Sequence, residues 1–258
     1  MGAEIPTTEK KMGSRVARVA NLLLLPRWSP NHPSDAKRLV FIRHAEGWHN
    51  KDYNEVEGYM ERGLGETEKY WDARLTPFGQ QQSRDIAPKL QEEVPGVQLV
   101  VVSPLSRAIE TAALAFPEDV QKKPFVSTSL CRERIWTHQC DRRRDRGALE
   151  RDFPFVDFSQ IQEGPDEMWD SKEIEPHVFE VEPHMNSTLC ARRATQFLQW
   201  LWKRPEDEIA IVSHWVFLKH VFKLYPEQTE LQEDFGNAEY RLVTLARDKD
   251  NAPAKDEM

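Results

Sequence analysis

Short apolar runs alternate with longer amphipathic stretches along this chain of 258 residues. Four of the runs are rich in β-branched and aliphatic side chains, which is typical of buried strands. The segment Leu39-Val40-Phe41-Ile42 belongs to the first of them. The four predicted strands cover 38–43, 97–102, 208–213 and 240–246.

The stretches between these runs predict helices. Thr76 followed by Pro77 is expected to be the N-cap and first residue of a helix that continues to about Glu93. Ser106 is expected to cap a second helix that continues through Phe116, and two more are predicted over 186–203 and 216–224. Strands that alternate with helices predict an α/β fold, a three-layer sandwich with a mostly parallel central sheet flanked by helices.

The alternation is broken between 129 and 185, where aromatic, proline and charged residues are mixed. We interpret 129–185 as an insertion, or cap region, over the active edge of the sheet, because functional loops gather there. Residues 38–247, with this insertion included, are expected to form a single domain. Residues 1–37 are interpreted as an N-terminal arm that packs its leucines on the domain, and 248–258 as a C-terminal tail.

Composition limits the function before any motif is considered. The net charge of −8 and the pI near 5.6 argue against broad binding to nucleic acid or to anionic membranes. No apolar run approaches the length of a membrane span. Three cysteines with no Cys-x-x-Cys spacing indicate neither a disulfide framework nor a zinc site, so a reducing, cytoplasmic location is expected.

Charged and nucleophilic side chains follow three of the predicted strands directly. Arg43 and His44 end the first strand, His214 ends the third, and Arg107 falls in the first turn of the helix after the second. Ligands of open α/β sheets bind at the carboxyl ends of the strands. Taken singly, Arg107 has an ordinary explanation as a surface charge and His214 as a satisfied core histidine. Their joint placement favours a local anion site in an acidic protein.

At these residues the sequence resembles the histidine phosphatase superfamily, also called phosphoglycerate-mutase-like, and its broad-specificity phosphatase branch. The resemblance covers about 38–245 and includes four motifs in the family's order. They are Arg43-His44-Ala45-Glu46 with Asn50, the segment from Asp72 through Thr76-Pro77, Ser103-Pro104-Leu105 with Arg107 and Thr111, and Val212-Ser213-His214, with a Leu130-x-x-Glu133 element before the last.

The resemblance implies a phosphoryl transfer in which His44 attacks phosphorus and forms a phosphohistidine. Arg43, Arg107 and His214 would hold the phosphoryl oxygens, with Asn50 as a further donor. Glu133 would protonate the leaving oxygen, although a salt-bridge role among its arginine neighbours is the alternative. Glu46 and Glu110 are the other carboxylates near motifs. No metal and no cofactor are implied.

Two departures from the family pattern point to the substrate. Ala45 stands where the family usually has glycine, and Trp215 follows His214 where small residues are common. Aromatic and basic residues near the motifs are candidates for the substrate pocket, although packing explains many of them equally well. These candidates are Trp48, His49, Trp136, Arg142 and Trp215.

The preferred hypothesis is a metal-independent phosphomonoester hydrolase that acts on a small phosphorylated molecule. One alternative is a phosphoglycerate-type mutase that returns the phosphate to a bound product. Another is a catalytically weak protein that binds phosphate or serves as a scaffold. The expected partner is the small-molecule phosphomonoester, with neither nucleic acid nor membrane, and a homodimer is left open.

Overall fold

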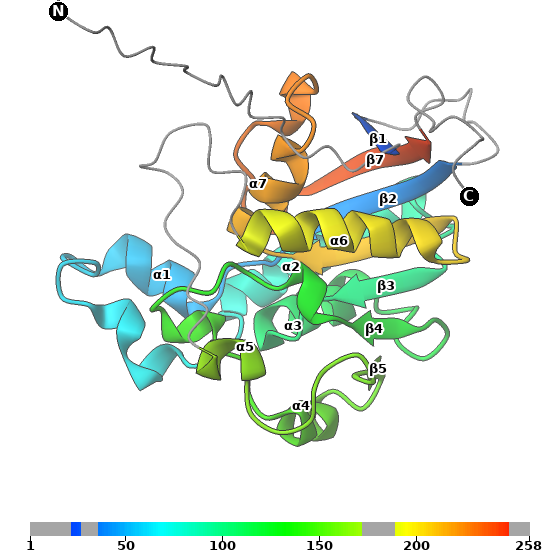
Figure 1. Ribbon diagram of the computed structural model, residues 1–258. Coiled ribbons are helices and arrows are strands. Elements are labelled where there is room, and N and C mark those ends of the chain that lie inside the picture. Colours follow the sequence, from blue (N-terminus) through cyan, green and yellow to red (C-terminus); the bar gives the residue numbers. More distant parts are fainter. Residues whose placement is uncertain (1–21, 27–35, 172–188, 248–258) are drawn as a thin grey trace, which may run out of the picture.

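The computed structural model describes residues 22–26, 36–171 and 189–247 (Figure 1). The helices and strands follow one another in the βα alternation expected from the sequence. In chain order they are β1 (Leu22–Pro26), β2 (Ala36–Arg43), α1 (Trp48–Glu55), α2 (Pro77–Glu93), β3 (Leu99–Val102), α3 (Ser106–Ala115), β4 (Phe125–Ser127), α4 (Arg146–Asp152), β5 (Val156–Asp157), α5 (Glu167–Asp170), α6 (Leu189–Lys203), β6 (Glu208–Ser213), α7 (Trp215–Lys223) and β7 (Tyr240–Arg247).

The strands form a seven-stranded sheet in the order β1-β7-β2-β6-β3-β4-β5. Strands β2, β6, β3, β4 and β5 are parallel neighbours, whereas β7 is antiparallel to both β2 and β1. The prediction of a mostly parallel sheet is therefore confirmed. Strand β1 comes from the leucine-rich segment of the predicted arm, and its Leu22 and Leu24 are buried.

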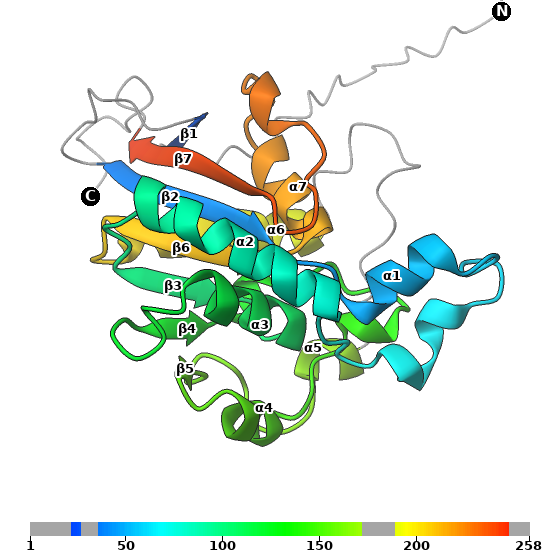
Figure 2. The same cartoon turned by 180° about the vertical axis from the view of Figure 1, so that it is seen from behind.

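Helices cover both faces of this sheet and complete the three layers. Helices α6 and α7 lie on the face seen in Figure 1, and α2 and α3 lie on the opposite face seen in Figure 2. Alternate residues of β2 enter the two cores: Phe41 packs with α6 and α7, whereas Ile42 packs with α3. Because both faces of the central strands are buried, their sequences read as continuous apolar runs.

Several elements differ from the sequence prediction. Helix α1 was not predicted, since it has no buried residue and hence no apolar face. Strands β4 and β5 are only three and two residues long, which is too short for a periodic signal. The fourth predicted helix begins one residue early, at Trp215. Residues 186–188 of the third predicted helix lie outside the described residues.

The cap of α3 also differs from the prediction. Ser106 is the first helical residue rather than the N-cap, which is Leu105. The helix end is instead held by Asp72, whose carboxylate accepts hydrogen bonds from the backbone N–H of Ser106 at 2.8 Å and from its hydroxyl. A side chain distant in sequence therefore supplies the acceptor that a local cap would provide. The predicted cap of α2 is confirmed: Thr76 Oγ1 accepts from Gly79 N at 3.0 Å.

Candidate active site

Three parallel strands bring their carboxyl ends together. In register, Arg43 of β2 lies beside Ser213 of β6, and Val102 of β3 lies beside Val212 of β6. The residues after these ends are therefore neighbours, and the ring centroids of His44 and His214 are 4.9 Å apart. In Figures 1 and 2, α1 and the segment with α5 lie beyond the same edge of the sheet.

The backbone fixes the orientation of the His44 ring. Its Nδ1 lies 2.7 Å from the carbonyl oxygen of Ala45. A carbonyl only accepts hydrogen bonds, so Nδ1 carries the ring proton and Nε2 keeps its lone pair. Burial, and then the positive charges of Arg107 and Arg43, hold the pKa of His44 well below its ordinary value. The imidazole is therefore neutral and nucleophilic at Nε2.

Arg107 directs its guanidinium at the free nitrogen of His44. Its Nε donates to His44 Nε2 at 3.2 Å, its Nη2 donates to Asp141 Oδ1 at 3.2 Å, and its Nη1 donates to the carbonyl of Cys140. One turn later on α3, Thr111 Oγ1 donates to the carbonyl of Arg107 and accepts from Ala45 N at 3.0 Å. The helix that carries Arg107 is thus tied to the loop that carries His44.

His214 presents one ring nitrogen with no partner. Its Nε2 lies 2.7 Å from Ser103 Oγ, which also accepts from the backbone N–H of Leu105. In the tautomer in which the serine hydroxyl donates to Nε2, the ring proton lies on Nδ1. Among the residues that the structure describes, Nδ1 is buried and has no hydrogen-bond partner. A buried donor of this kind is costly unless a ligand accepts from it.

Glu133 lies at the N-terminus of α7. Its carboxylate accepts from the backbone N–H groups of Val216 at 3.2 Å, Phe217 at 3.0 Å and Arg134 at 2.8 Å. Burial, and then the charge of Asp141, raise the pKa of Glu133 in spite of these hydrogen bonds. Glu133 forms no direct ion pair among the described residues, but the charges of Arg107 and Arg43 interact with its carboxylate.

These groups surround a cavity of about 450 Å³. Its lining includes seven of the candidate residues predicted from the sequence: Arg43, His44, His49, Asn50, Arg107, Glu133 and Trp215. Asn50 Oδ1 accepts from Gly47 N at 3.0 Å, which leaves its amide NH₂ as the group that can donate to a ligand. His214 is fully buried and is not among the lining residues, but its ring lies next to that of His44, which is.

Three pocket candidates lie outside this lining. Trp48 is 45% exposed. Trp136 packs beneath the guanidinium of Arg134, and Arg142 stacks on Trp71 at 4.9 Å. Their closeness in sequence to the motifs did not place them in the cavity, because α1 and the insertion turn these side chains toward other partners.

The cavity also contains side chains that the sequence did not single out for it. Asp141, Arg134, His138, Tyr59 and Asn237 all line it. The first three come from the insertion, and Tyr59 comes from the segment after α1. Asn237 Nδ2 donates to the carbonyl of His44 at 3.0 Å, from a loop almost 200 positions away. Of these residues, only Asp141 stands next to a conspicuous feature of the sequence, the run Arg142-Arg143-Arg144.

The two departures from the family pattern have clear structural positions. Among the described non-glycine residues, only Asp72 and Ala238 have positive φ, so Ala45 adopts ordinary backbone geometry. Trp215 lines the cavity as expected and is packed under Lys219, whose Nζ lies 4.8 Å from the ring centroid.

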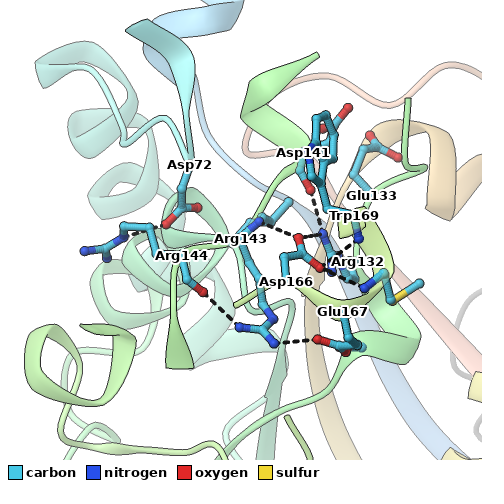
Figure 3. A network of polar contacts seen from close by, with 12 residues as sticks. Asp72, Arg132, Glu133, Asp141, Arg143, Arg144, Asp166, Glu167 and Trp169 are labelled. Atoms are coloured by element: carbon cyan, nitrogen blue, oxygen red, sulfur yellow. Dashed lines mark hydrogen bonds and ion pairs between the residues drawn. The ribbon is translucent and has the colours of Figure 1, made fainter. Parts of the chain in front are cut away.

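Most arginines of the insertion form hydrogen bonds and ion pairs that stabilise it. Arg132 and the backbone N–H of Arg143 converge on the buried carboxylate of Asp166 (Figure 3). Arg132 donates to both Asp166 oxygens at 2.6 Å and to the carbonyl of Asp141 at 2.7 Å. Arg144 pairs with Asp72 and Asp152. These arginines therefore hold the segment that carries Asp141 and Glu133.

Replacing Asp166 by Ala is expected to reduce the free energy of unfolding by about 3–5 kcal/mol, because Arg132 would be left as an unpaired buried charge. Burial opposes ionisation of Asp166, but the hydrogen bonds and charge of Arg132 hold its pKa below the usual value. Its stabilising effect is therefore present above the pKa of the unfolded chain and is lost as the pH falls through the lowered folded value.

Urea unfolding at neutral and acidic pH measures both effects. Asp85→Ala is the control, since Asp85 is exposed on α2, and we expect a change of about 0.5 kcal/mol or less. Equal losses in the two variants would contradict the structural role of Asp166.

Within 22–26, 36–171 and 189–247, no three His, Cys, Asp or Glu side chains are grouped so as to hold a metal ion. Over the same ranges, no helix has the length and apolar character of a membrane span. The three cysteines are buried, and none of them forms a disulfide within the described residues.

The chain is similar to several known proteins. Phosphoglycerate mutase-like protein of Arabidopsis thaliana is 31% identical over 243 residues, which cover 81% of this chain and 84% of the relative. Phosphoglycerate mutase-like protein 1 of the same plant is 28% identical over 244 residues and 81% of each chain. The solved structure of mycobacterial hydrolase 1 is 18% identical, covers 85% of this chain and 100% of its own, and gives a TM-score of 0.47.

Residues 39–137 match the family described as the histidine phosphatase superfamily, branch 1. This range includes His44, Arg107 and Glu133, and the relative with 31% identity extends the similarity over most of the chain. The protein is a member of the histidine phosphatase superfamily.

Proposed function

We propose that this protein is a metal-independent phosphatase that hydrolyses a small phosphomonoester through a phosphohistidine at His44. One observation carries the proposal. The bond from Nδ1 to the carbonyl of Ala45 leaves the lone pair of Nε2 facing Arg107 at the cavity. A nucleophile beside a guanidinium is the arrangement that phosphoryl transfer needs, because the group transferred carries negative charge.

In the first step, His44 Nε2 forms a bond to phosphorus as the bond to the leaving oxygen breaks. Arg43 and Arg107 offset the charge on the non-bridging oxygens, and the N–H at His214 Nδ1 donates to one of them. The amide NH₂ of Asn50 is a further donor. Arg107 must then exchange its contact with His44 for contacts with the phosphoryl oxygens.

Glu133 is proposed as the proton donor to the leaving oxygen. Burial raises its pKa and so favours the protonated form, and three backbone N–H groups hold the carboxyl in place. In the second step, the same group in its ionised form takes a proton from the water that attacks the phosphohistidine.

A mutase remains the second candidate because the two plant relatives are named phosphoglycerate mutase-like. It would form the same phosphohistidine but return the phosphoryl group to a second hydroxyl. A phosphate-binding scaffold would form no phosphoenzyme. We propose that the reaction takes place in the cytoplasm, in keeping with cysteines that form no disulfide in the described part of the chain.

Incubation with a panel of phosphomonoesters in excess EDTA tests the proposal. We expect release of inorganic phosphate and an acid-labile phosphoenzyme in which one phosphoryl group is bound per chain. Transfer of labelled phosphate to a second hydroxyl without release would favour the mutase. A requirement for added metal, or a stable protein with neither turnover nor phosphoenzyme, would contradict the hydrolase.

The pH dependence of the rate tests the role of Glu133. Since the acid must be protonated, kcat for an alkyl phosphate should fall as the pH rises through the raised pKa of Glu133. At the other end, the rate should fall as the pH drops through the lowered pKa of His44, because the protonated ring has no lone pair. The expected profile is bell-shaped.

Glu133→Gln should lower kcat for alkyl phosphates by about 10²-fold and remove the descending limb at high pH. The loss should be smaller with p-nitrophenyl phosphate, whose leaving group needs no proton. Glu110→Gln is the control, since Glu110 lies outside the cavity lining and accepts from Leu75 N at 2.9 Å. An unchanged profile in Glu133→Gln would assign the acid to another residue.

A further inference from the structure

Asp72 is a buried residue with an unusual backbone conformation. Its φ of 46° lies in the left-handed region, where only one other described non-glycine residue, Ala238, is found. Side chains disfavour this region, and such residues persist where surrounding contacts hold them, commonly near functional sites. Asp72 does not line the cavity, so any effect on the reaction must pass through another residue. Its contacts connect it to Arg107 in two ways.

The side chain of Asp72 holds the helix turn that carries Arg107. Its Oδ1 accepts from the backbone N–H of Ser106 at 2.8 Å, and its Oδ2 accepts from the Ser106 hydroxyl. Ser106 is the first residue of α3 and directly precedes Arg107. Leu105, at the N-cap, offers no side-chain acceptor to this helix. The position of the first turn of α3 therefore depends on the distant carboxylate of Asp72.

The segment around Asp72 also contacts the loop that binds the guanidinium of Arg107. The backbone N–H of Asp72 donates to the carbonyl oxygen of Gln139 through a long hydrogen bond of 3.4 Å. Tyr70 packs in one buried cluster with Cys140, whose carbonyl oxygen accepts from Nη1 of Arg107. The same short segment is therefore in contact with the backbone beside Arg107 and with the loop that binds its side chain.

Arg144 compensates the buried charge of Asp72. Its Nε donates to Asp72 Oδ2 at 2.9 Å (Figure 3), and its Nη2 donates to Ser106 Oγ at 2.9 Å. Burial raises the pKa of Asp72, whereas the hydrogen bonds of Ser106 and the charge of Arg144 oppose this effect. Arg144 also pairs with Asp152, so it keeps a partner when Asp72 is replaced. A substitution of Asp72 therefore removes the acceptor of the helix turn without leaving Arg144 unpaired.

We propose that Asp72 is a positioning residue for Arg107. It fixes the helix turn that carries the arginine and the loop that binds its guanidinium, and it thereby sets where the guanidinium meets the transferred phosphoryl group. Phosphoryl transfer needs a donor that is already aimed at the developing charge, and a misplacement of about 1 Å can cost on the order of 10²-fold in rate. The inference rests on the proposed function and adds a residue that acts on the reaction without touching the substrate.

Two substitutions remove the contacts of Asp72 in steps. Asp72→Asn retains an oxygen for the Ser106 N–H and tolerates the left-handed backbone, whereas Asp72→Gly retains only the backbone conformation. We expect kcat for a phosphomonoester to fall by about fivefold in Asp72→Asn and by about 10- to 100-fold in Asp72→Gly. Asp145→Gly is the matched control and should change kcat little, because Asp145 Oδ1 accepts from Gly147 N at 2.8 Å at the start of α4, outside the cavity lining.

Combination with Arg107→Ala separates positioning from a general loss of structure. If Asp72 acts through Arg107, neither substitution of Asp72 should lower kcat much further once the arginine is absent. Losses that multiply in full in the double variants would overturn the inference. Thermal unfolding verifies that each variant is folded, and the Asp72→Asn pair decides by the same criterion if Asp72→Gly does not fold.

Titration of His44 in the free protein, followed by NMR, tests the position of Arg107 without turnover. The charge of Arg107 lowers the pKa of His44, so a displaced guanidinium should raise that pKa in the Asp72 variants. Loss of the Asp72 charge alone would act in the opposite direction. If no ester is hydrolysed and no phosphoenzyme forms, the proposed function fails, and this titration alone decides the inference. A pKa of His44 that is unchanged or lowered in the Asp72 variants would refute it.

Discussion

Replacing His44 by Gln is expected to lower kcat/KM for every phosphomonoester by on the order of 10⁴-fold or more and to abolish the phosphoenzyme. The glutamine amide can still donate to the carbonyl of Ala45, as Nδ1 does at 2.7 Å in the wild type. The glutamine side chain offers no nucleophilic lone pair in place of that of Nε2, because the lone pair of the amide nitrogen is delocalised into the carbonyl group. The change therefore removes the chemistry while retaining the hydrogen bond that orients the side chain.

Steady-state rates and acid-quenched labelling measure this effect. His220→Gln is the matched control: His220 is also buried and has its Nδ1 2.8 Å from a backbone carbonyl, that of Val216, but it lies outside the cavity lining. We expect the control to retain activity and to form the phosphoenzyme. A phosphoenzyme in folded His44→Gln would assign the nucleophile to another residue.

Replacing Arg107 by Ala is expected to lower kcat by on the order of 10³-fold, because the guanidinium faces the reacting phosphoryl group in a buried site. A second effect follows from electrostatics. The charge of Arg107 helps to lower the pKa of His44, so its removal raises that pKa. The low-pH limb of the rate profile should therefore move to higher pH.

Arg142→Ala is the control for this substitution, since it also removes one arginine from the same region of the fold. Arg142 stacks on Trp71 and pairs with Glu68 at 3.8 Å, outside the cavity lining. We expect a small change in rate and no shift of the pH profile. Equal losses in the two variants, measured as kcat over a range of pH, would mean that Arg107 does not contact the phosphoryl group.

Four of the strands and the sheet that they form could be predicted because their signal is local. Strands β2, β3, β6 and β7 bury alternate residues in two cores, and such strands have continuous apolar sequences. Helix α2 could also be predicted, because the adjacent residues Thr76 and Pro77 are a typical N-cap and first helical residue. Helix α1 carries no such signal, because it presents no apolar face to the core.

The chemical centre could be predicted because its residues follow strand ends directly. Arg43, His44 and His214 do so, and parallel pairing of β2 with β6 brings them together. The residues that line the pocket around them could not be predicted from the sequence in this way. Trp48 and Trp136 lie close to the motifs in sequence but outside the cavity lining, whereas Asn237 reaches His44 from a distant loop.

The sequence by itself determined the α/β architecture, the family and the residues that converge at the strand ends, because strand periodicity and position after a strand are local properties. Only the tertiary structure decided which arginines of the insertion stabilise the fold and which one lines the cavity. Arg132 and Arg143 donate to carboxylates and carbonyls of the insertion, whereas Arg134 lies over Trp136 at the cavity, and its buried Nε and Nη1 have no hydrogen-bond partner among the described residues. In the sequence these arginines look alike, because burial and pairing depend on residues that are brought together only by folding.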